Sequence, residues 1–141
     1  MNTNERLRVL YVEDDCDSFE MLKVMLSLAH IEVDCATSEA DALALAGASR
    51  FDLYLLDGGS PEDSGFRLCR TLRASDPDIP VLFYSGNAHP DQIAAGMASG
   101  ADGYITKPNS DELAEAIIRI VTSYREKVSI PQSLPTLAFA T

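Results

Sequence analysis

Acidic, hydroxyl and cationic side chains stand at the ends of four short apolar stretches in this chain. They are Glu13, Asp14, Asp15, Asp57, Ser85 and Lys107. A carboxylate at the end of a buried strand loses part of its hydration, which costs free energy. This cost is offset by a bound metal ion or an opposite charge, or it is tolerated because the carboxylate takes part in a reaction. A set of acids with no histidine or cysteine among them offers the hard oxygen ligands that Mg²⁺ prefers, and Mg²⁺ also binds phosphate oxygens. The lysine and the hydroxyl would complete a phosphate-binding site.

Five short apolar stretches alternate with segments of helical periodicity, which is the pattern of repeated βα units around a parallel sheet. We predict strands at residues 8–12, 31–36, 51–56, 79–84 and 103–106. The fold class is therefore α/β, a doubly wound parallel sheet between two helix layers. Ligands of such open sheets bind beyond the carboxyl ends of the strands, so the six side chains above fall on one edge.

The helical pattern is weakest at residues 93–98. Gly96 costs about 1 kcal/mol relative to alanine in a helix interior, and the apolar stripe of this segment is thin. Because the segment follows Ser85 along the chain, it is a candidate moving part.

The last helical pattern ends in a proline-containing segment. Pro131 and Pro135 predict that the helix stops and that residues 128–141 form an extended tail or linker. We therefore expect one folded domain over residues 1–127, a length that can bury a single core without disulfide or metal staples.

Composition restricts the function classes. Eleven Lys and Arg against 22 Asp and Glu give a net charge of −11, which repels nucleic-acid phosphates and anionic lipid. We expect no direct nucleic-acid partner, no membrane association and a cytoplasmic location, because the sequence lacks a membrane-span pattern and a secretory signal pattern. The three cysteines show no CxxC spacing and predict reduced thiols.

The order and spacing of these motifs resemble those of response-regulator receiver domains of two-component signalling. The resemblance covers residues 7–124. It rests on VEDD at 12–15, FDLYLLD at 51–57 followed by Pro61 and Gly65, and GADGYITKP at 100–108. The alternation of elements leaves the strand order open, whereas the resemblance implies a (βα)5 fold with a five-stranded sheet of order 2-1-3-4-5.

By this resemblance Asp57 is the phosphoacceptor. It would attack a phosphoryl group on the histidine of a sensor kinase or phosphotransfer protein and form an acyl phosphate. Asp14 would bind Mg²⁺ directly, Glu13 largely through water, and Gly59 through its backbone carbonyl. The resemblance implies no enzyme activity beyond phosphorylation and dephosphorylation of Asp57 itself.

The resemblance also implies a coupled switch. Lys107 would neutralise the phosphoryl group, Ser85 and the Gly86 amide would bind it, and the peptide bond to Pro108 would be cis. Tyr104 would follow Ser85 inward and change a protein-binding face made of the fourth helix, fifth strand and fifth helix. Further possible site residues are Asp15 and Asn87.

The loop after Asp57 departs from the family pattern. Gly58 and Gly59 stand where receivers more often carry larger side chains, and Ser60 stands where they often carry methionine. Two glycines raise the entropy cost of ordering the loop, which weakens Mg²⁺ binding or quickens hydrolysis. Two alternatives therefore stay open: a receiver-like module that docks constitutively without phosphorylation, and an Asp-based phosphohydrolase, although such enzymes need a second acid where Gly59 stands.

Overall fold

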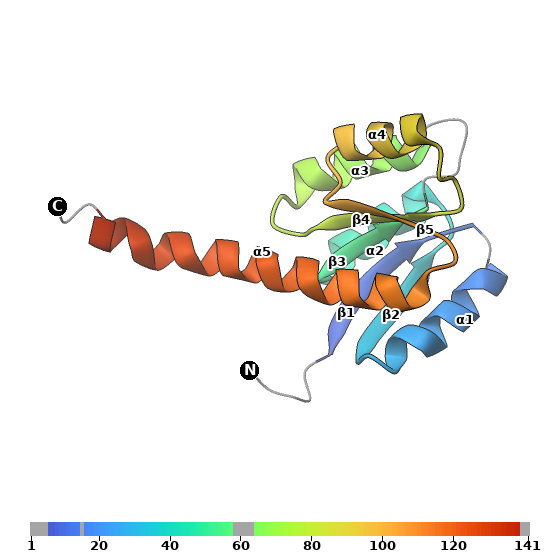
Figure 1. Ribbon diagram of the computed structural model, residues 1–141, viewed down its shortest axis with the longest axis horizontal. Coiled ribbons are helices and arrows are strands. Elements are labelled where there is room, and N and C mark those ends of the chain that lie inside the picture. The colour runs from blue at the N-terminus through green and yellow to red at the C-terminus, as the bar shows by residue number, and fades with distance from the viewer. Residues whose placement is uncertain (1–5, 15, 58–63, 139–141) are drawn as a thin grey trace.

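The computed structural model describes residues 6–14, 16–57 and 64–138. In this part of the chain five strands alternate with five helices (Figure 1). The elements are β1 Leu7–Val12, α1 Cys16–Ser27, β2 Ile31–Ala36, α2 Glu39–Ala48, β3 Leu53–Leu56, α3 Ser64–Ser75, β4 Val81–Ser85, α4 Pro90–Ala98, β5 Gly103–Thr106 and α5 Ser110–Ala138.

The five strands form one parallel sheet of order β2-β1-β3-β4-β5, which confirms the order that the resemblance implied. The register aligns the carboxyl ends of neighbouring strands: Val12 pairs with Ala36 on one side and with Leu56 on the other. Ser85 pairs with Thr106 at the same edge. The residues that follow β1, β3, β4 and β5 therefore meet at one edge of the sheet.

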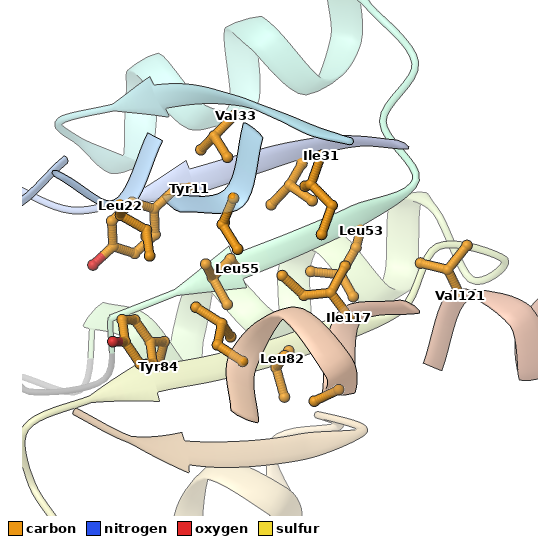
Figure 2. Close-up of a cluster of buried hydrophobic side chains, with 14 residues drawn as sticks. Tyr11, Leu22, Ile31, Val33, Leu53, Leu55, Leu82, Tyr84, Ile117 and Val121 are labelled. Carbon is orange, nitrogen blue, oxygen red and sulfur yellow. The ribbon is translucent and has the colours of Figure 1, made fainter. Parts of the chain in front are cut away.

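Two apolar cores lie on the two faces of the sheet. Strand side chains alternate between them, so Val9 and Tyr11 pack toward α1 and α5, whereas Leu10 packs toward α2 and α3. Figure 2 shows the first core, with Leu55 of β3 and Ile117 of α5 among its members. All four residues of β3 are buried, as expected of a central strand that is covered on both faces.

The strand bounds differ slightly from the prediction. β3 begins at Leu53 instead of residue 51, and β4 runs from Val81 to Ser85. Phe51 is nevertheless buried, beneath the Arg8 guanidinium at 4.9 Å from its ring centroid. Just before β3, the Asp52 backbone N–H donates to the Arg8 carbonyl at 2.7 Å, and the Asp52 side chain accepts the Arg8 backbone N–H at 2.8 Å.

The extended conformation predicted for residues 128–138 is wrong. α5 continues through Ala138 and projects beyond the sheet (Figure 1). Pro131 and Pro135 lie within this helix: the φ near −65° that the prolyl ring imposes is also a helical value, although neither residue can donate a backbone hydrogen bond. Among the described helices, none is long and apolar enough to cross a membrane.

Candidate functional site: an acidic cluster at the carboxyl edge of the sheet

Three carboxylates gather where β1 and β3 end. Glu13, Asp14 and Asp57 each place an oxygen within 4.8 Å of the other two. Backbone bonds fix two of them, because Glu13 N–H donates to Ala36 at 2.9 Å and Asp57 N–H donates to Val12 at 3.2 Å. Burial differs among the three: Glu13 is 4% exposed, Asp57 is half-buried and Asp14 is exposed.

Lys107 brings a cation to this cluster from the end of β5. Its Nζ donates to Glu13 Oε2 at 2.7 Å, and its side chain is 26% exposed. The Lys107 backbone N–H donates to Ser85 at 2.8 Å and continues the pairing of β5 with β4. The Lys107–Pro108 peptide bond is cis, as the resemblance implied.

Tyr11 is a member of the site that the sequence reasoning missed. Its hydroxyl donates to Glu13 Oε2 at 3.2 Å, and its side chain lies in the core near the carboxyl ends of the strands (Figure 2). Burial, and then the neighbouring charges of Glu13 and Asp57, raise the pKa of this phenol. The available signal was spacing, since residues two apart in a strand point to the same face.

Ser85 belongs to a second group beside the cluster. Its side chain is fully buried, and its Oγ accepts the Asn87 backbone N–H at 3.2 Å. The Tyr104 hydroxyl donates to the Asn87 carbonyl at 2.7 Å, and the Tyr104 ring lies 5.8 Å from that of Phe83. Gly86 is exposed with open space around it.

The structure thus brings most of the predicted residues to one sheet edge in two groups. The first group is Glu13, Asp14, Asp57 and Lys107, and the second is Ser85, Asn87 and Tyr104. Asp15 and Gly59 lie outside the described residues.

The donor set fits a hard divalent cation. Three carboxylates within reach of one ion supply oxygen ligands, which is what Mg²⁺ takes, while leaving positions for water and a phosphate oxygen. Lys107 balances part of the negative charge through Glu13.

A doubly wound α/β domain with acids at the carboxyl edge of its sheet belongs to the class of flavodoxin-like proteins that bind ligands at this edge. Similarity to known proteins identifies the family within this class. Residues 9–118 match the family model of the response regulator receiver domain, and the chain belongs to this family. It is a receiver domain of a two-component response regulator.

Individual relatives agree with this assignment. The chain is 37% identical over 126 residues to the transcriptional regulatory protein PrrA of Mycobacterium tuberculosis, a match covering 89% of this chain and 53% of PrrA. It is 35% identical over 116 residues to the cell cycle response regulator CtrA of Brucella ovis, covering 82% of this chain and 50% of CtrA. The chain therefore spans about half the length of the curated relatives it matches.

Solved structures share the fold. A CheY-like receiver domain protein from Methanospirillum hungatei superposes with a TM-score of 0.78 at 27% identity, covering 87% of this chain and 99% of the other. The chemotaxis protein CheY4 of Vibrio cholerae gives a TM-score of 0.73 at 30% identity, covering 82% of this chain and 98% of the other.

Proposed function

We propose that this receiver is a phosphoacceptor of a two-component phosphorelay and that Asp57 takes the phosphoryl group. The observation that carries the proposal is the cluster of three carboxylates within 4.8 Å, with the Lys107 ammonium bound to one of them. An Asp57 oxygen attacks phosphorus, the bond from phosphorus to the donor imidazole nitrogen breaks, and that nitrogen leaves with the bond's electron pair. The product is an aspartyl phosphate and a free histidine.

Charge is the main obstacle to this reaction, because a carboxylate nucleophile and a phosphoryl group repel each other. Asp14, Glu13 and Asp57 are the residues that would hold Mg²⁺, which supplies charge neutralisation during transfer. The family resemblance adds the Gly59 carbonyl to this set. Lys107 reaches the same place from β5 and adds a positive charge beside Glu13. The Tyr11 hydroxyl orients Glu13 Oε2 from within the core.

The phosphoryl group would then bind Ser85 and the Gly86 amide, which lie at the end of β4 next to Lys107. Movement of Ser85 would reach Tyr104 through the Asn87 backbone. The Asn87 N–H donates to the Ser85 hydroxyl, and the Asn87 carbonyl accepts from the Tyr104 hydroxyl. The outcome is a changed face of α4, β5 and α5, where Met97 and Ile118 are each 43% exposed. A target protein binds this face.

The phosphodonor would approach along α1, which begins two residues after Asp14. This helix carries a second apolar stripe that the core does not use. Its members are Met21, Val24 and Met25 of the helix and Leu28 just past its end, with exposures of 71%, 61%, 37% and 80%. Their i, i+3, i+4, i+7 spacing presents one face, and such a face suits an apolar stripe on a helix of the donor protein. Because α1 begins next to the acidic cluster, we propose that this stripe is the binding surface for the histidine kinase or phosphotransfer protein.

Proteins are the direct partners in this proposal. Relatives of about twice the length carry names such as transcriptional regulatory protein, but the net charge of −11 on this chain opposes direct contact with nucleic acid. DNA contact in a longer protein would therefore belong to a different domain. Catalysis by this chain is limited to phosphorylation and dephosphorylation of Asp57.

Intact mass spectrometry with acetyl phosphate tests the proposal. The wild-type chain should gain the mass of one phosphoryl group only with Mg²⁺, and Asp57→Asn should gain none. Absence of the adduct, with Mg²⁺ binding measured separately and no phosphate release above background, would favour a module that docks constitutively. Continuous phosphate release at many turnovers would favour a phosphohydrolase.

A further inference from the structure

The ring of Tyr104 rests directly on the backbone of α4 at Gly96. A Cβ atom at Gly96 would lie 3.1 Å from Tyr104 Cδ2 and 3.3 Å from Tyr104 Cε2. The same atom would lie 3.2 Å from Phe83 Cδ2. These contacts are tighter than most Cβ atoms tolerate, so the close approach of ring and helix depends on the absence of a side chain at Gly96.

The other end of the Tyr104 side chain is anchored to the loop that precedes α4. Its hydroxyl donates to the Asn87 carbonyl at 2.7 Å, and the Asn87 side chain accepts the His89 backbone N–H at 3.0 Å. His89 is the N-cap of α4. The helix therefore touches Tyr104 both through its own backbone at Gly96 and through the residues that start it.

A second helical glycine shows that the contact is particular to Gly96. Gly47 lies within α2, and an added Cβ there would meet nothing within 4 Å. Alanine stabilises a helix interior relative to glycine at either position, so the two sites differ in what surrounds them and not in the helix preference of the residue.

We propose that Gly96 is a positioning residue of the switch: the missing side chain at Gly96 leaves a seat for the Tyr104 ring against α4, so the position of the ring depends on this helix. The role of Tyr104 as a switch rests on the function proposed above, but the seat exists in the unmodified protein. When a methyl group enters the seat, Phe83 has no room to move because it is fully buried, whereas Tyr104 is partly exposed. Gly96→Ala therefore displaces the Tyr104 ring outward, breaks its bond to Asn87 and alters the α4 and β5 face without phosphorylation.

Fluorine NMR of the chain labelled with 3-fluorotyrosine measures the ring directly. The chain has five tyrosines, and Tyr104→Phe assigns the signal of interest. Gly96→Ala should shift the Tyr104 signal and increase its exposure to a soluble paramagnetic agent, while Gly47→Ala leaves it unchanged. An unchanged Tyr104 signal in folded Gly96→Ala, or an equal shift in Gly47→Ala, would overturn the proposal.

A double-mutant cycle keeps the test decisive if Gly96→Ala folds poorly. In a Tyr104→Ala background the two closest Tyr104 contacts are gone and Phe83 gains room to shift away, so Gly96→Ala should no longer lower the melting temperature, and Gly47→Ala should raise it in either background. An equal loss of melting temperature from Gly96→Ala with and without the Tyr104 ring would contradict a seat for that ring.

Phosphorylation provides the separating control. Gly96→Ala should still accept one phosphoryl group from acetyl phosphate, because Gly96 lies outside the acidic cluster. Failure of wild type to label would remove the proposed function but leave the ring measurements valid. Normal phosphorylation of Gly96→Ala with an unchanged Tyr104 signal would refute only the role proposed for Gly96.

Discussion

Replacing the phosphoacceptor should stabilise the domain. Asp57→Asn removes one of three carboxylates whose oxygens lie within 4.8 Å of one another, and it keeps the size of the side chain. The Lys107 ammonium donates to Glu13 at 2.7 Å and offsets part of this negative charge. Functional sites commonly retain such charge repulsion although it lowers the stability of the folded domain.

The magnitude follows from the separation of the charges. At 4.8 Å, the upper limit of these oxygen separations, two unit charges repel by about 0.9 kcal/mol in water and by about 3.5 kcal/mol at an effective dielectric constant of about 20. Asp57 is half-buried against the buried Glu13, so an intermediate value applies, less the attraction between Asp57 and nearby positive charge. We expect a gain of about 1–2 kcal/mol, which raises Tm by roughly 3–8 °C for a domain of this size.

Thermal unfolding at low and high ionic strength measures this gain. It should shrink as salt rises, because screening weakens the repulsion that the substitution removes. Asp52→Asn is the matched control at the opposite end of the sheet, where the carboxylate bonds the Arg8 backbone and Arg125 Nη2, and it should lower Tm. A Tm of Asp57→Asn at or below the wild-type value at low salt would refute the electrostatic reasoning.

Three further changes have defined outcomes. Lys107→Ala should lower the free energy of unfolding by about 1–3 kcal/mol, since it leaves the buried Glu13 carboxylate without its cation, and added Mg²⁺ should recover part of the loss in urea unfolding; equal stability would contradict this pairing. Tyr124→Phe should lower the free energy of unfolding by about 1–2 kcal/mol in urea, because the Tyr124 hydroxyl donates to Asp102 at 2.7 Å and accepts from Arg73. An unchanged urea midpoint would contradict a stabilising role for these hydrogen bonds. The contribution of Tyr11 to stability should be constant below pH 10 and be lost above it, because unfolded tyrosine ionises near pH 10 whereas burial raises the pKa of Tyr11 in the folded state. Tyr11→Phe should flatten this alkaline fall, and a fall of undiminished steepness would assign it to other groups.

Much of the fold follows from the sequence because apolar stretches of strand length alternate with amphipathic helices. The pattern predicts which segments are strands, and β2 and β5 have the predicted bounds. It does not predict strand order, because each β-strand is apolar and pairing energies between such strands are similar. The resemblance supplied the order. The tail was mispredicted because proline was given only its helix-breaking role, although its fixed φ is helical.

The site shows the same division. Strand ends in a parallel sheet meet at one edge, so the gathering of Glu13, Asp14 and Asp57 was predictable. The pairing of Lys107 with Glu13 was not, because these residues are 94 positions apart and their contact depends on side-chain geometry. The seat at Gly96 was invisible for a similar reason: the sequence marks a weak point in a helix, and only the structure shows the ring that lies on it.

Chemical mapping of the phosphoryl group is the most direct test of the phosphoacceptor. Borohydride reduces an acyl phosphate to an alcohol, which converts aspartate to homoserine. After treatment with acetyl phosphate and Mg²⁺ followed by borohydride, peptide mass mapping should find homoserine at position 57 and aspartate at position 14. Homoserine elsewhere with intact aspartate at 57, or a phosphoryl adduct that resists borohydride, would contradict phosphorylation of Asp57.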